Sequence, residues 1–298
     1  MTQVTVLAPV FHVYGGEHVL RREDLGKGAE QLPDSRIASL GVKKVIDPDH
    51  LKPFDKWRKQ VWAIAAKRGI RIMDGFGHNP AEVSETVTEI QAVLADARKQ
   101  AAFLVSDWDA LVDAWAMANP QWETLIRKGA PDRAWVRSRF EFGIHAYPLA
   151  LDALQDMGLA GNQLVQEMEG LGDKLVRELT TAATEMWQEF MTRPKIGKNQ
   201  ISPLVTMAQK AKSLAFLDAR AGKAAVEIRK VLDALPSSGP YERELPDILR
   251  VLRQVAKLGL PAEPEIPPLV PKASAQEARP KAVPEPLPIQ PATRVWAF

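Results

Sequence analysis

A run of apolar residues at helical spacing between Pro80 and Asn119 limits the fold more than any other part of the sequence. Asn79 and Pro80 are typical of a helix start, because asparagine is a favoured N-cap and proline fits the first turn. At about 1.5 Å per residue, an unbroken helix here would reach about 60 Å. So long a helix predicts an elongated body with a coiled-coil-like partner. Its apolar positions are Val83, Val87, Ile90, Val93, Leu94, Ala97, Ala101, Leu104, Val105, Trp108, Leu111, Val112 and Trp115.

The remainder of the C-terminal half also predicts helices. Pro131 is expected to open one of them, and glycines are expected to loosen the arm that begins near Pro148. Residues 193–197 contain a proline and a glycine and predict a turn. The pattern favours an antiparallel helical hairpin with a closing helix. The expected helices cover about 120–128, 131–143, 148–191, 203–235 and 241–258.

The first 78 residues predict a small α+β part. Residues 4–13 are β-branched and apolar, and Pro9 indicates an edge strand or a strand start. Gly15 and Gly16 favour a two-residue hairpin between residues 10–14 and 17–20. Pro53 is expected to open a helix that Gly69 ends. Residues 70–73 then read as short and extended, and residues 75–77 as a turn.

The amino-acid composition excludes several kinds of functional site. The chain has 298 residues, 39 Lys and Arg against 37 Asp and Glu, and no cysteine. Disulfides, thiol catalysis and Cys-ligated metals are therefore excluded. A net charge of +2 predicts neither attraction to nucleic acid nor repulsion from it. The start has no signal-peptide pattern and no apolar run is long enough for a membrane span, so a cytoplasmic location without a membrane partner is expected.

The residues offer little support for an enzyme. No phosphate-binding G-x-x-x-x-G-K-[ST] or G-x-G-x-x-G follows a strand, and no serine lies in G-x-S-x-G. No helix carries H-E-x-x-H or E-x-x-H. On the expected hairpin, His12 and His18 point to opposite faces of the sheet and do not share an ion. We therefore expect no catalytic residue, no metal and no cofactor.

Residues 261–298 hold ten of the 23 prolines and predict an extended, disordered tail. The tail ends in two aromatic residues, which supply much of the energy of small docking anchors. A flexible linker with such an end favours a docking role, and plain disorder or a structural contact is the alternative. The predicted docking residues are Arg294, Val295, Trp296 and Phe298. The expected parts of the chain are therefore 1–78, 79–147, 148–260 and 261–298.

Residues 133–142 interleave arginines with aromatic side chains. Stacking aromatics beside phosphate-binding guanidiniums are typical of single-strand binding. The alternative is that the aromatic residues belong to the core of a helix and the arginines extend to solvent. The candidate nucleic-acid contacts are Arg133, Trp135, Arg137 and Arg139.

Five short segments follow one another along the chain: Ser39–Pro48, Leu51–Phe54, Asp74–Gly77, Asn119–Trp122 and Val136–Phe140. Together they resemble the bacterial family grouped as domain of unknown function 3150, and the resemblance covers about residues 4–260. The family supplies no catalytic residues. Its genes tend to lie on phages, plasmids and integrative elements, beside a MoxR-type AAA+ ATPase and a von Willebrand A-domain protein.

The resemblance implies a non-catalytic helical adaptor or scaffold whose partner is the ATPase, the von Willebrand A-domain protein or both. A different class of protein is the alternative: a DNA- or RNA-binding accessory protein in replication or recombination of a mobile element. The sequence leaves open whether the long helices pair within one chain or between two copies.

Overall fold

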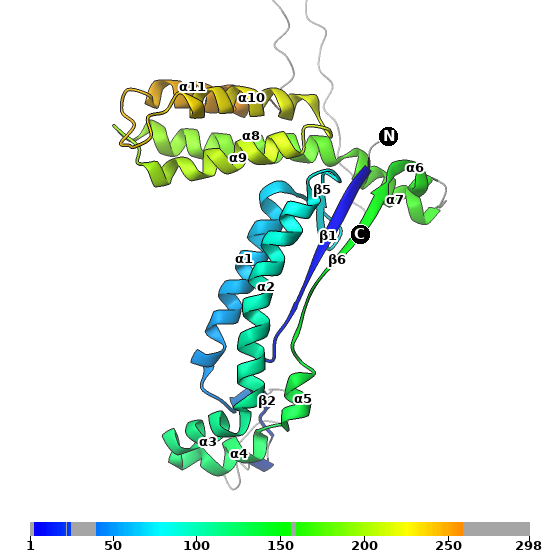
Figure 1. Cartoon of the computed structure of the whole chain (residues 1–298), viewed down its shortest axis with the longest axis vertical. Coiled ribbons are helices and arrows are strands. Elements are labelled where there is room, and N and C mark those ends of the chain that lie inside the picture. Colours follow the sequence, from blue (N-terminus) through cyan, green and yellow to red (C-terminus); the bar gives the residue numbers. More distant parts are fainter. Residues whose placement is uncertain (1–2, 22, 25–39, 156–158, 259–298) are drawn as a thin grey trace, which may run out of the picture. The chain divides into compact units, whose positions relative to one another are not determined.

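The computed structural model describes residues 3–21, 23–24, 40–155 and 159–258. These residues are mainly helical and contain an antiparallel sheet that includes the N-terminal strand (Figure 1). The expected mainly helical class with an antiparallel sheet at the N-terminal strand is therefore confirmed, but the sheet also takes a strand from residues 141–150 and is not confined to the first 78 residues. The predicted docking residues Arg294, Val295, Trp296 and Phe298 lie outside the described residues.

The main sheet has the strand order β4-β5-β1-β6 and is antiparallel throughout. β1 (Gln3–His12) pairs with β6 (Glu141–Ala150) along its whole length, whereas β5 (Gly75–His78) pairs only with Thr5–Leu7. β4 (Ile70–Ile72) completes the sheet. β1 continues through Pro9, so the predicted strand start at this residue was wrong, whereas the predicted edge is confirmed for this part of β1, which pairs with β6 alone. Proline is tolerated there since β5 does not extend that far along β1.

The predicted helix over 131–143 was wrong in its second half. Helix α5 (Arg133–Arg137) ends after five residues, and the chain then enters β6, which continues through Pro148. The arm expected from Pro148 therefore begins only after β6. Phe142 and Ile144, two residues apart on β6, point to the same face of the sheet. This two-residue spacing is typical of a strand, but it is hard to recognise between segments with helical spacing. Pro148 is accommodated because β6 is an edge strand.

The hairpin predicted at Gly15 and Gly16 was also wrong. β2 (Glu17–Val19) pairs with β3 (Val42–Lys44) and not with the end of β1. Gly16 has a φ of +66°, so the glycine allows the chain to leave β1 in a direction that other residues resist. After β3, the short helix η2 (Pro48–His50) leads into α1.

Residues 75–77 form part of β5 and not the predicted turn. The change of direction lies at Met73, which has a φ of 50°. Gly75 serves close packing, since a Cβ on this residue would lie 2.5 Å from the backbone oxygen of Leu7 in β1.

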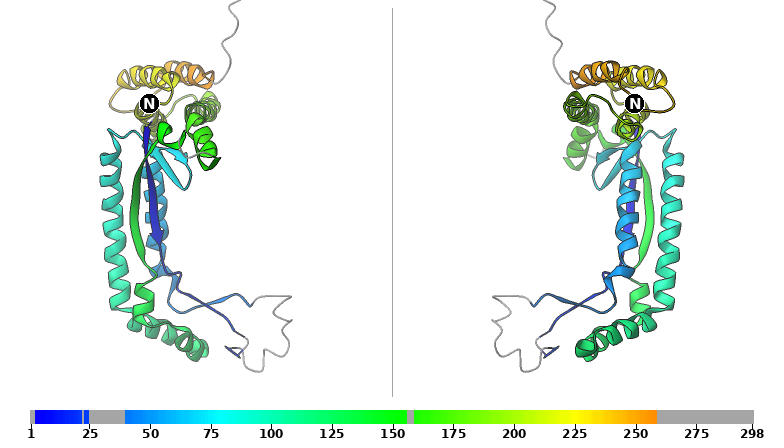
Figure 2. Two further views of the ribbon diagram at one scale, coloured as in Figure 1. Left: turned by 90° about the vertical axis from the view of Figure 1, so that its right-hand side faces the viewer. Right: turned by 90° about the vertical axis from the view of Figure 1, so that its left-hand side faces the viewer.

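Helices α1 (Lys52–Arg68) and α2 (Val83–Ser106) pack against each other and against one face of the sheet (Figure 2). The prediction for α1 is confirmed, including its end at Gly69. α2 begins three residues later than predicted: Glu82 is its N-cap, and Asn79 instead accepts a hydrogen bond from the backbone N–H of Ala81. The shared core contains Phe11, Phe54, Val61, Ala65, Phe76, Ile90, Val93, Leu94, Ala97, Ala101 and Leu104.

The predicted unbroken helix to residue 118 ends at Ser106. After Asp107 the chain continues as α3 (Trp108–Ala118), η3 (Pro120–Trp122) and α4 (Glu123–Gly129), which agrees with the predicted helix at 120–128. Trp108 is almost completely buried, and its indole N–H donates to the backbone oxygen of Pro131. A separate small core forms around Trp108, and its other members are Tyr14, Val45, Ile46, Val105, Val112, Ala116, Ile126 and Val136.

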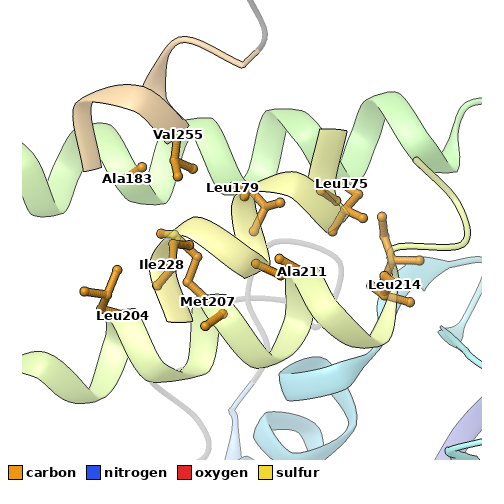
Figure 3. Close-up of a cluster of buried hydrophobic side chains, with 14 of the residues drawn as sticks. Leu175, Leu179, Ala183, Leu204, Met207, Ala211, Leu214, Ile228 and Val255 are labelled. Carbon is orange, nitrogen blue, oxygen red and sulfur yellow. The ribbon is translucent and has the colours of Figure 1, made fainter. Parts of the chain in front are cut away.

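The C-terminal helices build a third core (Figure 3). The predicted helix over 203–235 is interrupted between Leu214 and Asp218, where Asp218 caps a new helix. The arm predicted over 148–191 is divided at Gly170, which separates α7 from α8. The closing helix predicted over 241–258 is confirmed within that range as α11. The elements are α6 (Leu151–Gln155), α7 (Leu159–Glu169), α8 (Leu171–Met191), η4 (Lys198–Ile201), α9 (Ser202–Ser213), α10 (Ala219–Asp233) and α11 (Leu245–Ala256).

Candidate functional site

The arginine–aromatic segment folds as the short helix α5. Asp132 caps this helix by accepting from the backbone N–H of Trp135 at 2.8 Å. Val136 is buried in the small core around Trp108 and anchors the helix. This arrangement leaves the side chains of the four predicted contact residues exposed, namely Arg133, Trp135, Arg137 and Arg139.

The four residues have different surroundings. Arg133 forms an ion pair of 2.6 Å with Asp109, so part of its charge is neutralised. The ring of Trp135 contacts Tyr14 edge-on at 5.3 Å, and the guanidinium of Arg139 lies over it at 4.4 Å. Trp135 is therefore already covered by a cation and is a poor platform for a stacked base.

Arg139 also lines a pocket of about 580 Å³ at the end of β1. Arg58 of α1 lines the same pocket, and its guanidinium lies 5.7 Å from the ring centre of Phe11. His12 and Glu141 also line the pocket, and the Nδ1 atom of His12 lies 3.2 Å from the Oε2 atom of Glu141. Two arginines held over aromatic rings beside one polar pocket provide donors for a phosphate or carboxylate. No local sequence pattern links Arg58 with Arg139. The two residues line one pocket because β6, which follows Arg139, pairs with β1 along its whole length.

A polar cluster around the buried guanidinium of Arg68, between α1, α2 and α9, was not predicted. The guanidinium of Arg68 donates to Glu89 at 2.8 Å and to Glu85 at 2.7 Å. Nearby, Lys210 forms an ion pair of 2.6 Å with Glu178, so this cation is also paired. Arg68 ends α1 directly before Gly69. A basic residue at the end of a helix is usually explained by the last carbonyls and the helix dipole, so no sequence pattern predicts its burial.

His78 lies in the same region, and its buried Nε2 atom has no hydrogen-bond partner among the residues that the structure describes. Burial is the main cause that lowers the pKa of His78 to about 4, and the charges of Arg68 and Lys210 lower the pKa further. The Nε2 atom is closed off by Gly69, where a Cβ would lie 2.6 Å from it. The side chain therefore has no room for a ligand and is best explained as a neutral packing group.

The described residues contain no group of three or more histidines, aspartates or glutamates that could hold a metal ion. His12 and His18 lie on strands of two different sheets, so the expectation that they face opposite sides of one hairpin was wrong. Among the helices that the structure describes, none is both long and apolar enough to cross a membrane.

The comparison with protein families gives one result. A family model described as "Protein of unknown function (DUF3150)" matches residues 1–256. The chain belongs to this family. The DUF3150 match covers all the elements described above, from β1 to α11, and ends before the proline-rich segment. Comparisons with curated proteins and with solved structures found no match.

Proposed function

We propose that this DUF3150 protein is a non-catalytic helical adaptor of a MoxR-type AAA+ ATPase and von Willebrand A-domain module of a phage or another mobile element. The gene neighbourhood of the family suggests these partners. The structure supports the adaptor class through one observation: large apolar side chains are exposed around the small core at α3 and α4.

Met117 at the end of α3 and Trp122 in η3 are 72% and 51% exposed. Val19 and Val42, which are cross-strand neighbours in the β2–β3 pair, are exposed as well. β3 contacts α4, and β2 is paired with β3, so the four residues lie on elements that follow one another from the small core outward. Exposed apolar side chains gathered in one region are typical of a protein–protein contact.

The test is capture of the ATPase or the von Willebrand A-domain protein from nuclease-treated lysate of the native host. We expect Met117→Ser with Trp122→Ser to reduce capture strongly while the melting temperature stays near that of the parent. Val205→Ser with Val226→Ser is the matched control, because these valines are similarly exposed on α9 and α10. Equal capture by both double variants would contradict a docking role for Met117 and Trp122.

The predicted tail contact is tested in the same assay. Deleting residues 293–298 is expected to weaken capture and to leave helicity and melting unchanged, because an aromatic anchor on a linker contributes to binding and not to a core. Unaltered capture would remove the tail from the proposal. If neither partner is captured by the full chain, the adaptor function itself is contradicted.

The second candidate is DNA or RNA binding, and the observation that favours it is the pair Arg58 and Arg139 at one pocket. Phosphate contacts make affinity fall steeply with salt, so binding should weaken strongly between about 50 and about 200 mM salt. Arg137→Ala with Arg139→Ala should weaken binding at low salt. Lys56→Ala with Lys59→Ala on the exposed side of α1 is the control. Absence of binding at low salt would exclude this function.

A further inference from the structure

A cationic groove with an apolar floor lies between α8 and α11. Its volume is about 310 Å³, and it is separate from the arginine–aromatic pocket and from the exposed residues near α3. Among the residues that the structure describes, no acidic side chain lines it. The lining residues are Trp187, Pro246, Leu249, Arg250, Arg253, Gln254 and Lys257.

The rim of the groove carries three cations on one face of α11. Arg250, Arg253 and Lys257 follow helical spacing and therefore lie along the same side of the helix. Arg250 forms an ion pair of 3.1 Å with Asp247. Arg253 and Lys257 are exposed and make no ion pair with any residue in the described part of the chain. The rim thus presents charge that the rest of this helical bundle does not neutralise.

The floor is apolar. Trp187 is half-buried on α8 and packs against the core of the C-terminal helices, and Leu249 of α11 packs against the same core. Their remaining exposed surface faces the groove. A partner that fills the groove would therefore remove indole surface from water, in addition to placing charge beside the rim.

We propose that this groove binds an acidic peptide segment of a partner protein, in which carboxylates flank one apolar or aromatic side chain. The inference rests on the proposed adaptor function and names the chemistry of one partner contact. Arginine guanidiniums bind carboxylates through paired hydrogen bonds, and the central side chain packs on Trp187 and Leu249.

The dimensions favour a peptide over a nucleic-acid strand. The cationic stripe from residue 250 to residue 257 extends about 10 Å along α11 at the rise of an α-helix. Single-strand binding grooves track several phosphates and offer a series of aromatic platforms, with sites of about 4–16 nucleotides. This groove has one aromatic side chain and room for a short segment only.

Cations at the C-terminal end of a helix also stabilise it through the helix dipole; Arg253 lies in the last turn of α11 and Lys257 is its C-cap. That effect accounts for the position of the charges along the helix. It does not account for their placement beside an exposed part of Trp187. A binding measurement and a melting measurement separate the two roles.

The experiment uses the full chain and a short fluorescein-labelled peptide with glutamates around a central phenylalanine, followed by fluorescence anisotropy at low salt. We expect R253E/K257E to weaken binding at least about tenfold, since reversed charges repel the carboxylates. K56E/K59E makes the same change of charge on α1 and is expected to bind like the parent. Replacing the central phenylalanine of the peptide by alanine should also weaken binding, because the floor then remains uncovered.

Equal affinity of the parent and R253E/K257E for the peptide would overturn the proposal, as would the absence of peptide binding to the parent. If labelled oligothymidylate binds in place of the peptide and R253E/K257E abolishes that binding, the ligand is nucleic acid and the proposal is wrong. Melting temperatures of both double variants establish that each is folded. Peptide binding without capture of the ATPase or von Willebrand A-domain protein would contradict the adaptor function alone.

Discussion

At the scale of single residues, the most consequential side chain is the buried Arg68 of the polar cluster between α1 and α2. Arg68 is 5% exposed, and both its carboxylate partners come from α2. A guanidinium in this position is stable only while these hydrogen bonds remain, because a buried charge without partners is costly. The hydrogen bonds of Arg68 therefore join the C-terminal end of α1 to α2.

We expect Arg68→Ala to lower the free energy of unfolding by about 2–4 kcal/mol, because it removes two charge-assisted hydrogen bonds and leaves a void. Lys99→Ala is the control, since the side chain of Lys99 is 82% exposed and its pairing with Asp96 is long at 3.7 Å. Urea unfolding followed by circular dichroism measures both. A loss below about 1 kcal/mol for Arg68→Ala would contradict the assigned role.

His78 predicts how stability depends on pH. Its pKa is about 4 in the folded protein, against 6.5 for an unperturbed histidine. Between these values the unfolded chain binds a proton that the folded chain does not, so stability decreases as pH falls from about 6.5 to about 4, by about 3 kcal/mol in total. His78→Met should remove this part of the pH dependence in urea titrations.

The control for that measurement is His145→Gln, because His145 is exposed on β6 and should leave the slope unchanged. An identical slope for His78→Met and the parent would show that other groups cause the acid sensitivity. The comparison concerns slopes and not absolute stabilities, since replacing a buried side chain also changes the packing.

Sequence reasoning found part of the candidate site. It singled out Arg133, Trp135, Arg137 and Arg139 from local composition, and the structure places all four on one exposed segment. It missed Arg58 because a long-range strand pairing, which local composition does not encode, brings α1 to the same pocket. Arg253 and Lys257 were missed because cations near the end of an amphipathic helix are ordinary.

At the scale of elements, close packing of strands decides what β5 tolerates. A Cβ on Gly75 would lie 2.5 Å from the backbone oxygen of Leu7, whereas a Cβ on Gly143 would find its nearest neighbour at 4.0 Å. Both glycines lie in the same sheet. We expect Gly75→Ala to lower the free energy of unfolding by about 1–3 kcal/mol, because β1 and β5 must separate.

Gly143→Ala is the matched control, and it should be neutral or slightly stabilising because alanine restricts the unfolded chain more than glycine does. Thermal melting of the two variants side by side measures the difference. Similar destabilisation by both would mean that the loss comes from the residue type in a strand and not from the contact with Leu7.

Helices with strong apolar spacing could be predicted from the sequence, and the strand β6 could not. α1 and α11 were found because their apolar residues repeat and their ends carry clear signals. β6 lies between helices, and its Pro148 resembles a helix start. The break between α2 and α3 at Asp107 was not predicted, because the apolar residues keep helical spacing across it. The chain changes direction there so that Trp108 is buried in the small core.

At the scale of the whole described molecule, β1 contributes to two cores. Val4 and Val6 pack in the core with the C-terminal helices, and Phe11 packs in the core beneath α1 and α2. Deleting residues 1–8 should therefore lower the melting temperature by more than about 5 °C, since even a few kcal/mol has this effect. Deleting residues 261–298 is the control, because the three cores, as the described residues form them, are built from residues between Val4 and Leu258.

Differential scanning calorimetry of the two truncated chains measures this prediction. A small effect of the first deletion would mean that the helices of the C-terminal core are stable without the strand. In that case β1 would act only as a cover for one edge of that core.

The continuous pairing of β1 with β6 has a mechanical consequence. Hydrogen bonds in an antiparallel pair lie across the strand direction, so tension along the strands strains the whole ladder together and does not open it bond by bond. Pro9 lies within this ladder, between Val6, which enters one core, and Phe11, which enters the other. A pulling force on the helices at one end would be carried to the other end by a ribbon that resists extension.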